Sequence, residues 1–162
     1  MPVNPQIAIA AYSFNQNAAL LPKSIEGLTA EEWFHRPNES SNHMAWIVGH
    51  MIWARGAVIG LLGAEWTQPW PKLFARGVKV LDPAEYPAPE QIMASWKDVT
   101  ERLNAAMEAG SEETLAKPGP ERIPSADGKV SGVVNFLAHH DTYHIGQLGY
   151  LRTWLGHPGI VG

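Results

Sequence analysis

Two histidines near the end of the chain, His140 and His144, are four residues apart in the segment FLAHHDTYHIGQLGYLRTWL (136–155). On a helix this spacing places both side chains on one face, one turn apart, where they can bind the same metal ion. The other residues of that face are mostly apolar, so the two rings occupy positions where core residues belong. A buried imidazole costs about 1–3 kcal/mol unless its nitrogens find partners.

A third histidine, His50, has the same unusual surroundings. It lies in the apolar run from Trp46 to Trp53, so few rotations of a helix there would leave it in water. One ion between two helices would satisfy all three imidazoles and leave open positions, as in a catalytic metal site. On pattern alone, histidines bonded to carbonyl or carboxylate groups are the alternative. The pattern therefore makes His50, His140 and His144 candidate ligands of a divalent metal ion and leaves that alternative open.

Three polar residues close to these histidines are candidates to orient them. Metal-bound imidazoles usually donate their second N–H to an acceptor. Gln147 is best placed, because it lies one turn beyond His144 on the same face. Tyr143 is a further candidate. Asp141 is another, although a surface or interhelical contact is favoured for it.

The other four histidines are interpreted differently. His139 is about 100° round the helix from His140 and is expected to face away. His43 is seven residues before His50, so it is a candidate outer ligand, although an ordinary place at the start of the helix is favoured. His35 and His157 lie in loop or terminal contexts and are expected to be solvated.

Four segments have the apolar periodicity of helices. No stretch shows sustained alternation with period two, so a sheet is not expected. The chain is therefore predicted to be all-α, a four-helix bundle with long crossover connections forming one domain over residues 1–162. The predicted helices run from about Pro5 to Leu21 (Asn4 as N-cap, Pro22 as the stop), from about Asn42 to Leu62, from Pro89 to just before Gly110, and from after Ser131 to Leu155.

The three connections, at roughly 22–41, 64–88 and 111–130, are long for a simple bundle and are expected to be functional or to contain short elements. Residues 28–32 (LTAEE, ending at Pro37) and 111–115 (SEETL, ending at Pro118) look alike, which suggests two related halves. The middle connection contains Trp66 and Trp70 and is interpreted as a crossover that covers one end of the bundle.

Composition excludes several classes of function. A net charge of −4, without any basic run, argues against binding to nucleic acid. The absence of cysteine excludes disulfides, thiolate metal sites and a cysteine nucleophile. Residues 44–62 are apolar enough to be considered as a membrane-spanning helix, but His50 and Arg55 would be costly in lipid. No signal peptide is recognisable at the N-terminus, so a soluble, cytoplasmic protein is expected.

Two histidine segments carry a family resemblance. The segment from His140 to Gln147 (HDTYHIGQ), and residues 28–37 followed by SNHMAWIVGH (41–50), resemble the DinB-like (damage-inducible) family over nearly the whole chain. The resemblance implies a four-helix bundle with a three-histidine site for nickel, zinc or a similar ion, with the ligands at His50, His140 and His144. It also implies a homodimer. Relatives include thiol-dependent S-transferases, a mycothiol-dependent isomerase and proteins called metal-dependent hydrolases.

Three functions are compatible with such a site. The first is a transferase in which a low-molecular-weight thiol attacks a small electrophilic substrate, the thiol pKa being lowered by the ion. The second is hydrolysis by metal-activated water, with Asp141 or Glu65 as the base by elimination. The third is a non-catalytic, stress-related binding module in which His43 closes the coordination of the ion. Imidazole ligands suit zinc, nickel, copper and iron alike, so the sequence does not select the metal.

Overall fold

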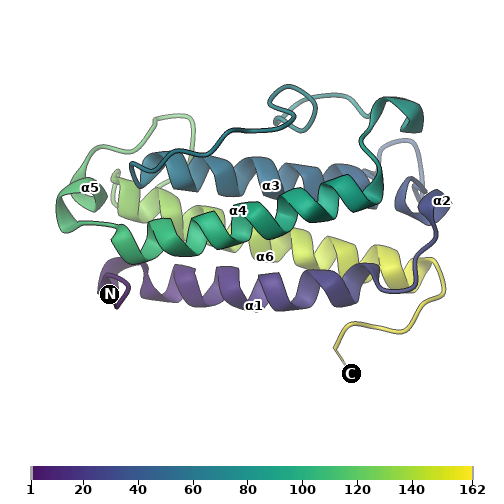
Figure 1. The fold of residues 1–162 in the computed structure, drawn as a ribbon, viewed down its shortest axis with the longest axis horizontal. Coiled ribbons are helices and arrows are strands. Elements are labelled where there is room, and N and C mark those ends of the chain that lie inside the picture. The colour runs from purple at the N-terminus through teal and green to yellow at the C-terminus, as the bar shows by residue number, and fades with distance from the viewer. Residues whose placement is uncertain (1, 162) are drawn as a thin grey trace.

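The computed structural model describes residues 2–161, and in that range the fold is all-α, as predicted, with no strand. Four long helices lie side by side along the molecule (Figure 1). Two short helices lie in the connections. The long helices are α1 (Ala8–Ile25), α3 (Met44–Leu61), α4 (Pro89–Ala109) and α6 (Val130–Trp154), and the short ones are α2 (Ala30–Trp33) and α5 (Glu112–Ala116).

The connection between α3 and α4 determines the topology. It returns along the length of the molecule, so that α3 and α4 run in the same direction, while α1 and α6 run in the opposite one (Figure 1). Helix α6 packs against both α1 and α3, and α3 also packs against α4. The prediction that this crossover covers one end of the bundle is wrong, because it runs lengthwise over α3 instead.

Two glycines of α3 let the crossover come close to the helix. A Cβ at Gly49 would overlap the buried ring of Phe74, and a Cβ at Gly56 would overlap the side chains of Trp66 and Gln68. These glycines are seven residues apart, so they lie on one face of α3. The connection therefore packs on this face of α3. Phe74 lies against Gly49, the residue that precedes His50 in the sequence.

The two short helices begin with side-chain caps. The Thr29 hydroxyl accepts from the backbone N–H of Glu32, whose carboxylate accepts from the Thr29 N–H in return. The Ser111 hydroxyl accepts from the N–H of Thr114. Both lie in the segments whose sequences look alike, and the expectation of short elements in these connections is confirmed.

Helix α1 differs most from its predicted boundary. A 3₁₀ turn capped by Asn4 precedes it, and the helix continues through Pro22 to Ile25. A proline inside a helix removes one hydrogen bond. Here Leu21 and Ser24, on either side of it, are both fully buried, and this packing favours continuation. The prediction that Pro22 ends the helix is therefore wrong.

Helix α3 begins two residues later than predicted, at Met44 instead of Asn42. The cap is His43, whose Nδ1 accepts from the backbone N–H of Trp46 at 3.0 Å. The other predicted boundaries of α3, α4 and α6 lie within about two residues of the observed ones.

Within residues 2–161, α3 is the one helix long and apolar enough to cross a membrane by length and composition alone. However, 72% of that 18-residue window is buried inside the fold. Arg55, in its second half, is 1% exposed and fully partnered by other helices. The apolar character of α3 is thus explained by its place in the core.

The close approach at Gly49 gives a first prediction. Replacing Gly49 with alanine should lower the free energy of unfolding by about 1–2 kcal/mol, because overpacking of about 1–3 kcal/mol outweighs alanine's better helix propensity. At Gly60, also in α3, an added Cβ meets nothing within 4 Å, so Gly60→Ala should stabilise by up to about 1 kcal/mol. Urea unfolding measures both, and an equal gain in the two variants would contradict the packing of Phe74 on α3.

Candidate metal centre

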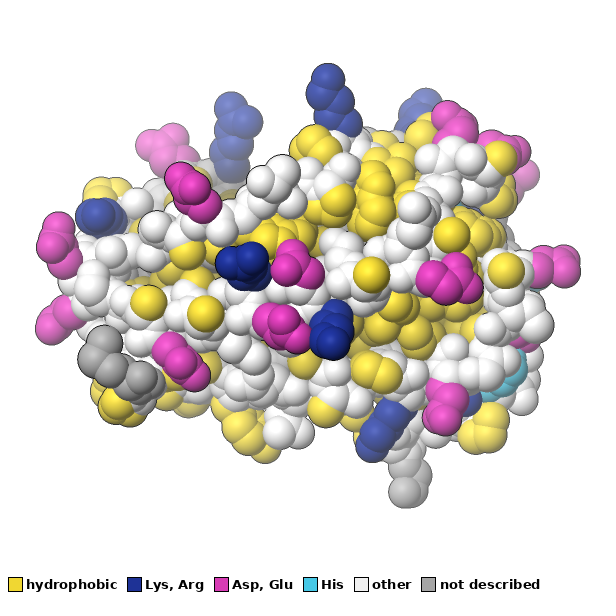
Figure 2. Space-filling model, in the orientation of Figure 1, with side chains coloured by type: hydrophobic (Ala, Val, Ile, Leu, Met, Phe, Trp, Pro, Cys, Tyr) yellow, Lys and Arg dark blue, Asp and Glu magenta, His cyan; other side chains and the backbone are white. Residues whose placement is uncertain are grey.

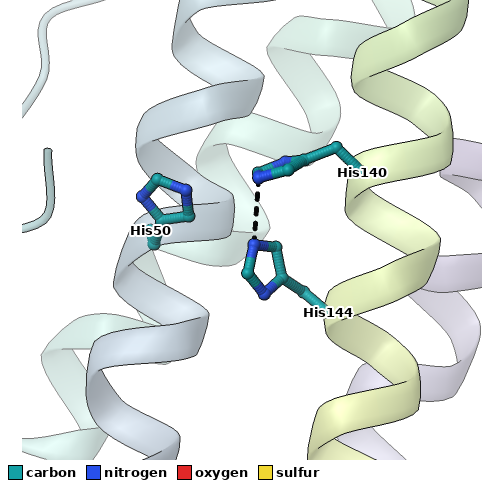
Figure 3. A group of neighbouring side chains, drawn as sticks. All are labelled: His50, His140 and His144. Carbon is teal, nitrogen blue, oxygen red and sulfur yellow. Dashed lines mark hydrogen bonds between the residues drawn. The ribbon is translucent and has the colours of Figure 1, made fainter. Parts of the chain in front are cut away.

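The three predicted histidines meet between two helices. His50 projects from α3, and His140 and His144 project from α6 toward it (Figure 3). One ring nitrogen from each lies within 4.8 Å of the others. The Nε2 atoms of His140 and His144 are 3.0 Å apart. Nitrogens bound to one ion at about 2.0–2.1 Å stand roughly 3 Å from each other, so this pair has the spacing of metal ligands.

Helical phase explains which histidines enter the site. His50 and His144 are 5% and 6% exposed, and His140 is partly buried on the same face of α6. His139, one residue earlier, is exposed, as predicted. The interface of α3 with α6 thus selects His140 from the adjacent pair.

A backbone carbonyl fixes the orientation of His50. Its Nδ1 lies 2.7 Å from the Phe74 oxygen. Because a carbonyl only accepts, Nδ1 carries the proton and, in a neutral ring, Nε2 keeps its lone pair. The ring also stacks with Trp46 and Trp53, at centroid distances of 4.9 and 5.8 Å. The crossover and α3 together hold this imidazole ready to act as a ligand.

Gln147 has the corresponding role for His144. The Nδ1–H of His144 donates to Gln147 Oε1 at 2.7 Å, and the amide nitrogen of Gln147 donates to the Tyr143 hydroxyl at 3.1 Å. His144 Nε2 is therefore left with a lone pair facing His140. The Nδ1 of His140 is buried and has no hydrogen-bond partner among the described residues. Two of the three rings are thus oriented by a second group.

Burial keeps the three imidazoles neutral. It is the largest cause that lowers the pKa of each, and for His144 the pKa falls to about 4, with the neighbouring His140 as a second cause. The Arg76 cation further lowers the pKa of His50. Metal binding requires deprotonated ligands, so at neutral pH these side chains are in the form that an ion needs. The donor set fits a divalent ion.

Comparison with known families agrees with this site. Residues 13–148 match the family model described as the DinB superfamily, which covers most of the chain. The chain belongs to the DinB superfamily. A search of curated proteins finds no match. The resemblance seen in the two histidine segments is thereby confirmed.

In this DinB-superfamily protein, Asp141 is committed to a buried ion pair. Its Oδ1 and Oδ2 accept from Nε and Nη2 of Arg55 at 3.1 and 2.9 Å, and the two side chains are 2% and 1% exposed. Asn17 of α1 donates to the same carboxylate at 2.9 Å. Asp141 thus makes an interhelical contact and is not placed to accept from a ligand imidazole.

Arg55 is the residue near the centre that sequence reasoning missed. Besides Asp141, it donates to the Phe14 carbonyl and the Thr100 hydroxyl, and its guanidinium lies 3.9 Å from the Trp96 ring centroid. It connects α3 to the other three long helices. An arginine in an apolar helix, together with an aspartate between two core histidines, was the available signal.

The remaining candidates lie elsewhere. His43 is 1% exposed, caps α3 and packs edge-on against Phe34 and Tyr86, outside the histidine cluster. Glu65 lines a shallow surface pocket with Trp66, Asp98 and Arg102.

The two peripheral histidines are at the surface but not free. The ring of His35 stacks on Trp154, and His157 lies 2.9 Å from a Glu32 carboxylate oxygen. His35 is nevertheless exposed, as expected, whereas His157 is only partly exposed.

His43 gives a second prediction, on acid stability. Burial, with the nearby Arg36 cation, lowers its pKa from 6.5 to about 4. Below pH 6.5 the unfolded chain binds a proton here that the folded protein excludes until about pH 4. Stability should therefore fall with pH through this window, by up to about 3 kcal/mol for this group. Asparagine is also a good N-cap. The change His43→Asn should flatten the loss of stability between pH 6.5 and 4.5 in urea unfolding, and an unchanged slope would refute this assignment.

Proposed function

We propose that this protein is a divalent-metal-dependent enzyme whose ligands are His50, His140 and His144 and whose substrate is a small molecule. The observation that carries the proposal is the convergence of three neutral imidazoles from two helices, two of them buried and one partly buried, with Nε2 of His140 and His144 3.0 Å apart. Three protein ligands leave open positions on an ion such as nickel or zinc, which is typical of catalytic sites.

Within this class we favour transfer to a low-molecular-weight thiol. When bound, the ion acts as a Lewis acid that lowers the pKa of a coordinated thiol or water. The chain has no cysteine, so a sulfur nucleophile has to come from outside. The Phe74 carbonyl and Gln147 hold two of the rings, while Trp46 and Trp53 shield the faces of His50 from water.

The hydrolase and the non-catalytic module both depend on residues that lie outside the histidine cluster. Hydrolysis needs a general base, but Asp141 is paired with Arg55 and Glu65 lies in a different pocket. Among residues 2–161, no carboxylate belongs to the cluster of candidate ligands. In a closed, non-catalytic site His43 would complete the coordination of the ion, but His43 caps α3 instead. These placements support the transferase over both.

The test uses protein purified without a chelating tag and loaded with cobalt(II). Adding N-acetylcysteine should change the visible spectrum, and a dinitrophenyl chloride should then be consumed. In that reaction sulfur forms a bond to the ring carbon, chloride leaves and the thiol proton goes to solvent. Ester hydrolysis without thiol would favour the hydrolase. An unchanged spectrum and no consumption of the electrophile would overturn the transferase.

The expected homodimer and cytoplasmic location stay predictions, the first measurable by light scattering during size-exclusion chromatography. We propose neither a nucleic acid nor a membrane as partner. On the face seen in Figure 2, Lys and Arg side chains are interspersed with Asp and Glu, which supports this view.

A further inference from the structure

A cavity of about 670 Å³ lies beside the histidine cluster. One wall is the loop of residues 37–42 that precedes α3, and the other is the outer face of α6, with Tyr143, Gly146, Gln147 and Tyr150. This volume is in the range of small-molecule sites, which run from about 300 to 1,000 Å³.

The lining combines apolar side chains, among them Pro37, Ile47 and Leu151, with polar groups, and it carries no charge. The loop contributes amides and hydroxyls, α6 contributes phenol, hydroxyl and amide groups, and no Asp, Glu, Lys, Arg or His lines the cavity. The loop is held in place, because Asn38 Oδ1 accepts from the Ser40 N–H and the Ser41 hydroxyl. A charged ligand would find no partner for its charge here, whereas a neutral ligand with hydrogen-bonding groups would find several.

Two exposed tyrosines give the cavity its shape. Tyr143 and Tyr150 are 60% and 64% exposed, and Gly146 lies between them on the same face of α6. Helical spacing of three and four residues aligns the three positions. Two flat aromatic rings beside a position without a side chain suit a planar group.

Gln147 connects the cavity to the histidines. It lines the cavity, and its Oε1 accepts from His144 Nδ1–H at 2.7 Å. None of the three histidines reaches the cavity itself. A ligand that hydrogen-bonds to the Gln147 amide would therefore act on His144 from the side opposite to the lone pair of Nε2.

We propose that this cavity binds an uncharged, planar small molecule with hydrogen-bonding groups, and that Gln147 transmits its presence to His144. Binding in the cavity stands independently of any metal. Its consequence for the metal centre rests on the proposed function.

The first test compares three probes of one shape and different charge on the metal-free protein: benzamide, benzoate and benzamidinium. Followed by NMR, benzamide should shift the side-chain amide signals of Gln147 and bind at least fivefold more tightly than either ion. Equal or tighter binding of an ion, or no shift at Gln147 with any probe, would overturn the proposal.

A pair of glycine variants controls for location. A Cβ at Gly146 meets nothing within 4 Å, so Gly146→Phe should fill the cavity without disturbing the fold and weaken benzamide binding at least tenfold. Gly60 is the comparison position, exposed near the C-terminal end of α3 and equally open to a side chain. The variant Gly60→Phe should bind benzamide as the unmodified protein does. Retained binding in Gly146→Phe would refute the assigned site.

The coupling is tested separately through the imidazole nitrogen signals of His144. Benzamide should shift them in the unmodified protein but not in Gln147→Ala, even where the probe still binds. A shift of equal size in that variant would refute transmission through Gln147. If the probe binds and shifts His144 but no divalent ion binds, the proposed function fails while the cavity assignment stands.

Discussion

Replacing His144 with alanine is expected to weaken binding of a divalent ion by about 100-fold or more. Loss of a group that merely orients a ligand typically costs 10–100-fold, and loss of the ligand itself should cost at least as much. His144 is 6% exposed, and its Nε2 faces the corresponding atom of His140 at 3.0 Å. Competition against a zinc or nickel indicator measures the affinity directly.

The matched control is His139→Ala. His139 lies on the same helix, next to His140, but is exposed and outside the cluster, so its loss should change affinity less than twofold. Thermal unfolding gives an independent readout. A ligand at 100 times its Kd stabilises the folded state by about 2.7 kcal/mol, and His144→Ala should lose this gain while His139→Ala keeps it. Equal affinities in the two variants would exclude His144 as a ligand.

These histidines could be predicted because the signal for them is local. Spacing along one helix places His140 and His144 together and turns His139 away. The apolar run around His50 likewise marks its face as buried. Their proximity across α3 and α6 followed from the family resemblance, since periodicity alone says nothing about which helices pack together.

What could not be predicted depends on contacts between distant segments. Phe74 orients His50 only because the crossover runs along α3 over Gly49, and nothing in residues 64–88 specifies that path. Pro22 resembles a helix stop in the sequence, yet the helix continues to Ile25 because residues on both sides of the proline are buried. In each case tertiary packing outweighs a local preference.

The ion pair of Arg55 with Asp141 could not be predicted for the same reason, and breaking it is the second change from which we expect a large effect. The two residues are 86 positions apart, and the carboxylate lies in α6 between His140 and His144. Arg55 is in α3, five residues after His50. The bidentate contact thus fixes α3 against α6 beside the two segments that carry the histidines, and we expect it to set their register as well as to contribute to stability.

Replacing Asp141 with alanine should therefore lower the free energy of unfolding by about 3–5 kcal/mol, because it leaves the guanidinium of Arg55 buried without a counter-charge. Arg102→Ala is the control. It breaks only an exposed pair with Asp98, in which Arg102 is 65% and Asp98 54% exposed, and should cost no more than about 1 kcal/mol in urea unfolding.

The double variant Arg55→Met with Asp141→Leu separates stability from position. Two apolar side chains of similar volume can replace a buried ion pair with little loss of stability, so this variant should recover most of what Asp141→Ala loses. It lacks the bidentate contact, however, and we expect its affinity for zinc to stay at least tenfold below that of the unmodified protein, with an altered cobalt(II) spectrum. Full recovery of both affinity and spectrum would show that the pair contributes only to stability, and that packing alone aligns α3 with α6.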